Sequence, residues 1–259
     1  PYLAAAGELK TKPTQHSVKT LLENGIQPDI LVCRTEHHLN ANIKRKVARF
    51  CNVEIDAVIE SLDAKTIYEV PILMQKEGLD KIVLKKLGLD DNSELKLTKW
   101  NNFLKNIQNP NQEISIGLVG KYVELQDAYK SISEAIIHSG ATHSCKVNVK
   151  WIHAEDINEK NVEEKVKSLK GVIVAPGFGD RGIEGKISTI KYLRENQIPF
   201  FGICLGMQSA VIEYSRNILG LENANSTEMD PTTSDPVIDL MKDQKKVTEK
   251  GGTMRLGAY

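Results

Sequence analysis

One cysteine in the sequence has the neighbours of a catalytic nucleophile. Cys204 lies between Gly202 and Gly206, where an apolar run at 198–203, typical of a buried strand, gives way to a helical pattern. In a G-x-C-x-G arrangement the glycines leave room for a sharp strand-to-helix turn that presents the sulfur at a sheet edge. A helix N-terminus beside a thiol favours the thiolate, which attacks carbonyl carbons. The alternative is a core residue, because free cysteines are among the most buried residue types.

A glycine-rich loop at 176–182 precedes this elbow by one strand. The loop follows directly after 171–175, an apolar run that is typical of a buried strand. Such a loop exposes backbone N–H groups, which an oxyanion needs, although glycine is also common in tight turns without chemistry. Because Cys204 follows the next strand, parallel order places the loop and the thiol at the same edge of a sheet.

A polar segment at 10–16 lies near the N-terminus. Its two lysines, two threonines and one glutamine beside Pro13 offer charge and hydrogen bonds to a phosphate. On the residues alone, a solvated basic loop is the preferred interpretation. A helical pattern begins at Ser17 as N-cap, and a second helix with a basic face is expected at 41–50. That helix follows an apolar run at 30–34, near the strand end where open α/β sheets bind ligands.

The spacing of strands and helices predicts an α/β fold with two domains and mainly parallel sheets. Continuous apolar runs at 30–34, 114–121 and 171–175 alternate with helical patterns, which is typical of parallel strands joined by helices. The sequence turns polar after Leu89, and we place the domain boundary in that stretch. Trp100, Phe103 and Leu104 at helical spacing predict a last helix packed on the first domain.

The composition excludes several classes of protein. Thirty-four basic and thirty-four acidic side chains cancel, so no global field attracts nucleic acid or an anionic membrane. Four cysteines without a C-x-x-C pair argue against a zinc site or a disulfide framework and favour a reducing compartment. No apolar segment is long enough to span a bilayer. We therefore expect a cytoplasmic protein without nucleic-acid or membrane partners and without a metal site in this chain.

Several motifs in one order resemble a known family. The segment 202–208 resembles the nucleophile motif of class I glutamine amidotransferases, and 10–19, 120–122, 127–131, 223–228 and 251–257 are similar to the CTP synthase family. The resemblance covers essentially the whole chain. For the second domain it implies a doubly wound, mainly parallel sheet with a nucleophile elbow.

The resemblance implies an ATP-dependent ligase that aminates UTP to CTP with ammonia released from glutamine. It further implies ATP with Mg²⁺, whose ligands are expected outside this chain, GTP as an allosteric activator, CTP as an inhibitor, and a homotetramer for the whole enzyme. The implied domains are the C-terminal part of a synthetase domain at 1–90, a linker at 91–112, and an amidotransferase domain at 113–259 that lacks its C-terminal end.

The resemblance also implies roles for individual residues of this sequence. In the amidotransferase domain, Cys204 attacks the glutamine amide and forms a thioester, Gly177 and the Leu205 backbone form the oxyanion hole, and the glutamine is held by Gln208, Glu228 and Arg255. In the synthetase domain, the residues implied for UTP or CTP are Lys10, Thr11, Lys12, Pro13, Thr14, Gln15 and Lys46, and Arg34 is implied for ATP. The GTP response is tied to Lys130, Phe178 and Arg181.

The sequence departs from the family pattern in three places. Pro176 stands where the family loop has a glycine, so one backbone N–H is missing. All six histidines precede Cys204, whereas the family takes its histidine and glutamate from a segment after the elbow. No G-x-x-x-x-G-K-[ST] loop is present, and the chain opens on Pro1. We therefore expect a central fragment with little turnover alone. The alternatives are a non-catalytic nucleotide-binding, glutamine-binding or assembly module and a cysteine hydrolase of another γ-glutamyl compound.

Overall fold

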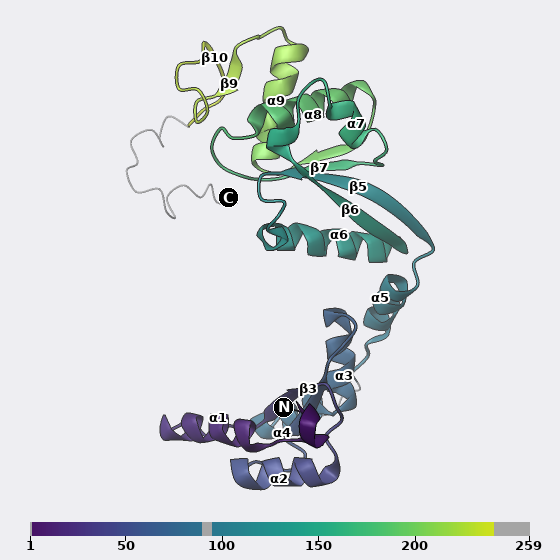
Figure 1. The fold of residues 1–259 in the computed structure, drawn as a ribbon, viewed down its shortest axis with the longest axis vertical. Coiled ribbons are helices and arrows are strands. Elements are labelled where there is room, and N and C mark those ends of the chain that lie inside the picture. The colour runs from purple at the N-terminus through teal and green to yellow at the C-terminus, as the bar shows by residue number, and fades with distance from the viewer. Residues whose placement is uncertain (1, 90–94, 241–259) are drawn as a thin grey trace. The chain divides into compact units, whose positions relative to one another are not determined.

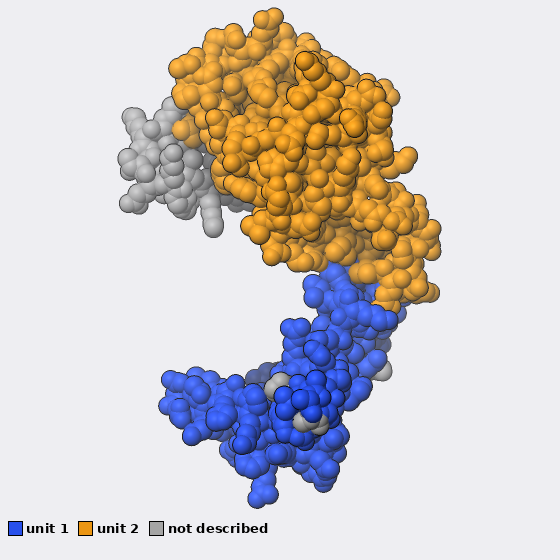
Figure 2. Space-filling view, viewed as in Figure 1, with its two compact units in different colours: residues 1–104 blue, residues 105–259 orange. Residues whose placement is uncertain are grey.

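The structure has two α/β units, each with its own parallel strands (Figures 1 and 2). The computed structural model describes residues 2–89 and 95–240, and the two units are Pro1–Leu104 and Lys105–Tyr259. Arg255, which the family resemblance assigns to glutamine binding, lies outside the described residues. The fold class expected from the sequence, mixed α/β with mainly parallel sheets, is confirmed.

Unit 1 is built around a βαβ arrangement. Strand β3 (Leu31–Thr35) pairs in parallel with β4 (Val58–Leu62), and helix α2 (Ala41–Cys51) connects them. Val18 and Val47 pack with neighbouring apolar residues into the core of this unit. The other described elements are β1 (Tyr2–Leu3), η1 (Ala4–Ala6), β2 (Glu8–Leu9), α1 (Lys12–Glu23), η2 (Ile67–Glu69), α3 (Val70–Lys76) and α4 (Leu79–Leu87).

Helix α1 begins earlier than the sequence pattern indicates, so the prediction of Ser17 as its N-cap is wrong. The N-cap is Thr11, and Pro13 stands in the first turn. Proline suits this position because its fixed φ is helical and its missing N–H has no intrahelical partner there. Ser17 lies inside the helix, where its hydroxyl donates a 3.1 Å hydrogen bond to the Pro13 carbonyl. The expected basic loop is therefore a helix N-terminus.

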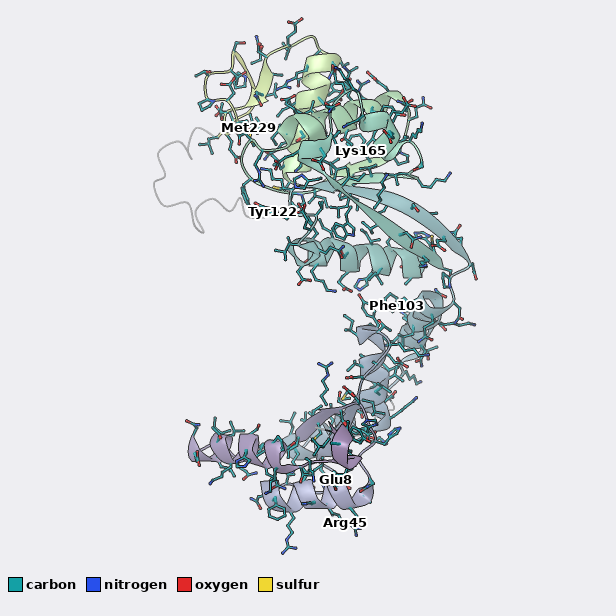
Figure 3. The ribbon with its side chains drawn as sticks, viewed as in Figure 1. Glu8, Arg45, Phe103, Tyr122, Lys165 and Met229 are labelled. Atoms are coloured by element: carbon teal, nitrogen blue, oxygen red, sulfur yellow. The ribbon has the colours of Figure 1, made fainter. Side chains whose placement is uncertain are left out.

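Helix α5 (Thr98–Gln108) lies across the division between the units, inside the segment 91–112 that was predicted to be a linker. Its first half packs on unit 1 through aromatic side chains. Trp100 Nε1 donates a 2.8 Å hydrogen bond to the Tyr68 carbonyl, and the ring of Phe103 (Figure 3) meets the Tyr68 ring edge-on at 5.2 Å. The helix expected at the end of the first domain is confirmed, and the domain bounds stay predictions.

Unit 2 is a doubly wound sheet of four parallel strands in the order β6-β5-β7-β8. In Figure 1, helix α6 covers one face and helices α7, α8 and α9 cover the other. The strands are β5 (Gln112–Gly120), β6 (Cys145–His153), β7 (Val172–Val174) and β8 (Phe200–Gly202). The helices are η3 (Gln126–Tyr129), α6 (Lys130–Thr142), η4 (Ala154–Asp156), α7 (Val162–Val166), α8 (Ile183–Glu195) and α9 (Leu205–Asn217), followed by a small parallel pair, β9 (Ala224–Ser226) and β10 (Asp235–Ile238).

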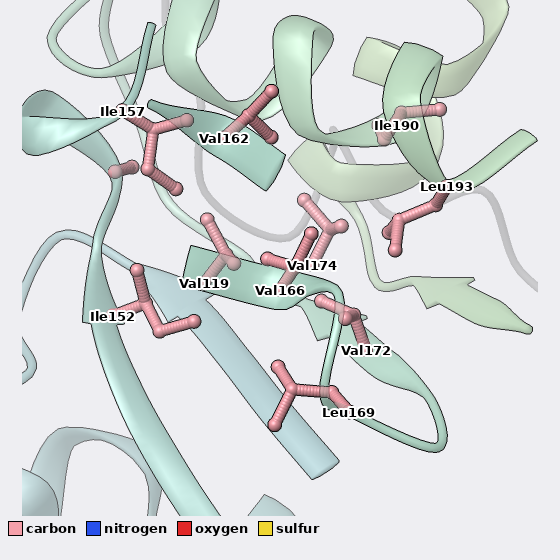
Figure 4. Packing of buried hydrophobic residues seen from close by; sticks show 11 residues of the cluster. Val119, Ile152, Ile157, Val162, Val166, Leu169, Val172, Val174, Ile190 and Leu193 are labelled. Atoms are coloured by element: carbon pink, nitrogen blue, oxygen red, sulfur yellow. The ribbon is translucent and has the colours of Figure 1, made fainter. Parts of the chain in front are cut away.

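Both faces of β5 are buried in its C-terminal half, which fixes the strand end that leads to the candidate site. Val119 packs against Val166 of α7 and against Leu193 of α8 in the largest core cluster (Figure 4). The adjacent Leu118 points to the opposite face, because side chains alternate along a strand, and packs with Tyr129.

Strand β8 is less buried than its apolar sequence indicates, so the prediction of a buried strand there is wrong. Among the described strands it pairs with β7 alone, and Phe200 and Phe201 are 37% and 65% exposed. Phe201 and Ile203 line a mainly apolar cavity of about 540 Å³ beside α6. A continuous apolar run does not distinguish a central strand from an edge strand, because both bury at least one face.

Candidate active site

The turn from β8 into α9 holds Cys204 in a strained conformation. Its φ is 52° and its ψ is −108°, outside the usual regions for a residue with a Cβ atom. Such strain persists only where the surrounding structure holds it, and it gathers at functional sites. Leu205 is the first residue of α9, so its N–H has no partner within the helix.

The two glycines of the elbow are required by close packing. A Cβ atom on Gly202 would lie 2.6 Å from the carbonyl oxygen of Gly206, and one on Gly206 would lie 2.1 Å from the carbonyl oxygen of Val174. Both distances are far below contact, and the obstructing atoms belong to the backbone, which cannot rotate away. The G-x-C-x-G spacing therefore reflects how closely α9 approaches β7.

Cys204 differs from the other three cysteines in its exposure. Its side chain is exposed, whereas Cys51 and Cys145 are buried and Cys33 is half-buried. Burial raises the pKa of the Cys33 and Cys51 thiols, which disfavours their thiolate forms. The alternative of a core cysteine therefore fails for Cys204.

The glycine-rich loop after β7 lies against the start of α9, as parallel strand order requires. A Cβ atom at Gly177 would lie 3.6 Å from Leu205 Cδ2, so the two residues implied for the oxyanion hole are neighbours. No hydrogen bond among the described residues uses the Gly177 N–H. Glu228, which precedes β10 in the chain, accepts a 3.2 Å hydrogen bond from the Gly179 N–H. The loop, the elbow and Glu228 thus form one site.

Two buried lysines hold this loop, and sequence reasoning missed the function of both. Lys121, at the end of β5, is 4% exposed and donates to the carbonyls of Phe178 and Gly179. Lys186 of α8 is completely buried, and its Nζ donates a 2.7 Å hydrogen bond to the Ala175 carbonyl. Burial, followed by repulsion from Lys121, lowers the pKa of Lys186 to about 8.

A signal for Lys186 exists in the sequence. Ile183, Ile187, Ile190 and Leu193 form the buried face of α8, and Lys186 falls on that same face by helical spacing. A lysine on an apolar helix face is exceptional, because lysine is almost never fully buried unless it is paired.

The remaining residues implied for unit 2 differ in their exposure and in their distance along the chain from the elbow. Gln208 is half-buried in the first turn of α9, where its N–H donates to the Cys204 carbonyl at 3.0 Å. Phe178 is 83% exposed, and Arg181 pairs with Glu155 at 2.7 Å. Lys130 instead begins α6, where an ion pair with Glu134 raises the pKa of Lys130. The loop thus carries two of the three residues that the family resemblance implies for a GTP response.

In unit 1, the residues implied for UTP or CTP gather at the N-terminus of α1. Lys10 forms an ion pair with Glu8, which holds the pKa of the Glu8 carboxyl below its usual value. Figure 3 labels Glu8 in unit 1. The positive charge of Lys46 in α2 lowers the pKa of Glu8 in the same direction, but less than Lys10 does. Thr11 is buried and accepts a 3.1 Å hydrogen bond from Gln15 Nε2. The other implied residues, Lys12, Pro13 and Thr14, form the first turn of α1.

Arg34 occupies a separate place in unit 1. It lies in β3, and its Nε contacts Asp63 Oδ1 at 3.1 Å. Together with Tyr2, Thr35 and Asp63 it lines a cavity of about 540 Å³ with both polar and apolar walls. The residue implied for ATP is therefore beside a cavity of its own rather than at the α1 N-terminus.

Two further observations concern the described ranges 2–89 and 95–240. Within them, no group of three or more histidine, cysteine, aspartate or glutamate side chains is arranged to hold a metal ion. In the same ranges, no helix has the length and apolar character that a membrane crossing requires.

The parallel sheet and its cysteine elbow define a class I glutamine amidotransferase. The family model "Glutamine amidotransferase class-I" matches residues 124–259, more than half of the chain. A second model, "CTP synthase N-terminus", matches residues 1–89. The chain therefore belongs to the CTP synthase family of class I glutamine amidotransferases.

Two curated relatives agree with this assignment. The chain is 66% identical over 259 residues to a CTP synthase from Flavobacterium johnsoniae and 65% identical to one from Christiangramia forsetii, covering all of this chain and 48% and 47% of those proteins. A solved glutaminase domain of Trypanosoma brucei CTPS with bound acivicin is 29% identical, with a TM-score of 0.47, covering 54% of this chain and 60% of that one. The chain spans about half the length of the curated relatives that it matches.

Proposed function

We propose that unit 2 releases ammonia from the side-chain amide of glutamine, with Cys204 as the nucleophile. In the whole protein this ammonia converts UTP to CTP in an ATP-dependent reaction. The observation that carries the proposal is the exposed thiol of Cys204, held at φ 52° at the start of α9 with Gly177 beside Leu205.

The proposed reaction is an acyl transfer to sulfur. The Cys204 thiolate forms a bond to the amide carbon, and the carbonyl electron pair moves to oxygen, where the N–H groups of Gly177 and Leu205 stabilise it. The C–N bond then breaks, the nitrogen takes up a proton and leaves as ammonia, and water hydrolyses the thioester to glutamate. Pro176 supplies no N–H to this hole, so Gly177 carries the loop's contribution.

Glutamine is oriented by groups around the same loop. Glu228 is the proposed partner of the substrate α-ammonium group, and its contact with the Gly179 N–H couples substrate binding to the loop. Gln208 lies one turn after Cys204 on α9. Arg255, the proposed partner of the α-carboxylate, lies outside the described residues.

Unit 1 is proposed to bind the nucleotides of the synthetase reaction. The N-terminus of α1 supplies N–H groups and a favourable dipole for phosphate, and Lys10, Lys12 and Lys46 supply charge for UTP or for CTP as inhibitor. Arg34 and its cavity are proposed for ATP. The described residues do not fit a Mg²⁺ site, so no step is assigned to that ion here. A homotetramer and a GTP response through Lys130, Phe178 and Arg181 are proposed for the whole protein.

The general base of the glutaminase reaction is not identified in this chain. A thiolate nucleophile ordinarily works with a histidine that a third group orients, and all six histidines precede Cys204 in the sequence. We therefore expect slow hydrolysis of glutamine by this chain alone, with covalent capture of Cys204 as the more sensitive readout.

The test is labelling with 6-diazo-5-oxo-L-norleucine, an electrophilic glutamine analogue. We expect one adduct per chain by intact mass, slower labelling in the presence of glutamine, and no adduct in Cys204→Ala. Cys33→Ala is the matched control, since it removes a half-buried thiol from unit 1. Labelling that glutamine does not slow would favour a hydrolase of another γ-glutamyl compound. Absence of the adduct at Cys204 would favour a non-catalytic module, which calorimetry with UTP and CTP would then examine.

A further inference from the structure

Lys186 is a buried charge that the proposed reaction does not yet use. Its side chain is completely buried on α8, yet its Nζ lies beneath the loop that carries Gly177. The Nζ donates a 2.7 Å hydrogen bond to the Ala175 carbonyl, and it lies 3.7 Å from the position that a Cβ atom on Gly177 would occupy. The ammonium is therefore directly adjacent to the backbone of the oxyanion loop.

This ammonium has no carboxylate partner among the described residues. No ion pair there includes Lys186, and its hydrogen bond to Ala175 uses one of three donors. The nearest other cation, Lys121, holds the far part of the same loop and repels it. Removing a cation from water without an anion is costly. The folded protein thus keeps an uncompensated positive charge at this position.

Three carboxylates on elements packed around Lys186 are engaged elsewhere. Glu155 of η4 pairs with Arg181, Glu213 of α9 pairs with Arg194, and Glu184 of α8 pairs with Arg216. Among the described residues, Cys204 at the elbow is the group whose negative charge favours protonated Lys186. Within this part of the chain, no anion compensates Lys186 until charge develops at the elbow.

We propose that Lys186 is a positioning residue of the oxyanion hole: its ammonium fixes the Ala175 carbonyl and places positive charge beside the Gly177 backbone where the oxyanion forms. This role rests on the function proposed above. Attack by the thiolate moves its negative charge from sulfur onto the carbonyl oxygen, beside the Gly177 backbone and the buried ammonium, so the interaction strengthens in the transition state. The ammonium has no compensating anion in the resting protein, and it therefore stabilises the oxyanion more strongly when that charge forms.

The proposal is tested by comparing two reactions of the same thiol. Attack of Cys204 on 4-nitrophenyl acetate forms a carbon–sulfur bond through an oxyanion and expels 4-nitrophenolate, giving the S-acetyl enzyme. Alkylation by iodoacetamide displaces iodide and passes through no oxyanion. The full chain is used for both, and the rate of Cys204→Ala is subtracted so that only the elbow thiol is counted.

For Lys186→Met, which keeps the volume and removes the charge, we expect the ratio of acylation to alkylation to fall about tenfold or more. We also expect a melting temperature at pH 7 that is equal to or above that of the unsubstituted chain, because an uncompensated buried charge is removed. A merely structural lysine would instead lower both rates and the melting temperature together. The matched control is Lys191→Met on the same helix, which loses an exposed ion pair with Glu159 and is expected to change neither ratio nor melting temperature.

Other outcomes separate this inference from the proposed function. An unchanged ratio in a folded Lys186→Met protein would overturn the role of Lys186 while leaving Cys204 as nucleophile. If Cys204→Ala is acylated as fast as the unsubstituted chain, the assignment of Cys204 as the nucleophile would be overturned. If Lys186→Met does not fold, the unsubstituted chain gives the answer: the ratio should fall as pH rises through about 8, where Lys186 loses its proton, and a constant ratio would overturn the proposal.

Discussion

The two units hold their charges in opposite ways. At the N-terminus of α1 in unit 1, Lys10 is half-exposed and already pairs with an exposed Glu8. At the elbow of unit 2, Lys121 and Lys186 are buried and bind backbone carbonyls instead of carboxylates. In unit 1, a ligand that binds Lys10 must displace both water and the Glu8 carboxylate. The arrangement in unit 2 is organised before any ligand arrives.

This difference matches the chemistry that each site is proposed to perform. Phosphates are fully charged in solution, so exposed cations that rearrange around them are sufficient for binding. An oxyanion exists only in the transition state and gains most from donors that are already fixed. The tight contacts of Gly202 and Gly206 supply that rigidity at the elbow.

The largest expected effect comes from breaking that rigidity. In Gly206→Ala the new Cβ meets the Val174 carbonyl oxygen at 2.1 Å, so α9 or β7 must move. We expect unit 2 to lose about 3 kcal/mol or more of unfolding free energy, measured by urea denaturation, together with most of the acylation of Cys204. The control is Gly171→Ala, whose Cβ meets only the Pro199 carbonyl at 3.3 Å. Equal destabilisation by both changes would show that the elbow is not specially tight.

The second largest effect concerns the buried charge of Lys186 in unit 2. The pKa of Lys186 is about 8 in the folded chain against an ordinary 10.5, so between these values the unfolded state binds more protons than the folded state. Stability contributed by this group therefore rises as pH increases. Between pH 8 and 10 the unsubstituted chain should gain about 2 kcal/mol relative to Lys186→Met.

The difference between the two proteins is the quantity to measure, by urea denaturation at each pH. Cys33 and Cys51 have raised pKa values, which make stability fall as pH increases through their titration. Both proteins contain these cysteines, so the subtraction removes their contribution. A difference that stays constant with pH would mean that Lys186 is not held as a buried cation.

The elbow could be predicted from sequence because its constraints are local. The spacing of Gly202, Cys204 and Gly206 encodes a close approach of helix and strand within a few residues. The position of the Gly177 loop beside it follows from parallel strand order, which is a topological rule and needs no detailed packing. The sequence pattern therefore predicts the fold class and the edge of the sheet at which the site lies.

Other features depend on contacts that a pattern does not contain. Helical spacing indicates that Lys186 is buried, but it does not place Lys186 at the site, because its partner Ala175 belongs to a strand–loop junction elsewhere in the sequence. The contact between Glu228 and Gly179 joins residues 49 positions apart. The start of α1 was missed because the lysines and threonines of its first turn resemble a polar loop, and the helical φ of Pro13 carries the deciding information.

The smallest expected effect on stability concerns unit 1, where the charges are exposed. Glu8→Gln removes the exposed carboxylate that pairs with Lys10, and the unfolding free energy should change little, since surface ion pairs contribute little. Affinity for UTP, measured by calorimetry, should nevertheless rise a few-fold at low salt and less at high salt, because the ligand's phosphates no longer compete with Glu8. Glu23→Gln, which removes the 4.0 Å partner of Lys19 at the other end of α1, should leave UTP affinity unchanged. Weaker UTP binding in Glu8→Gln would mean that Glu8 organises the lysines, and the contrast between the two units would then disappear.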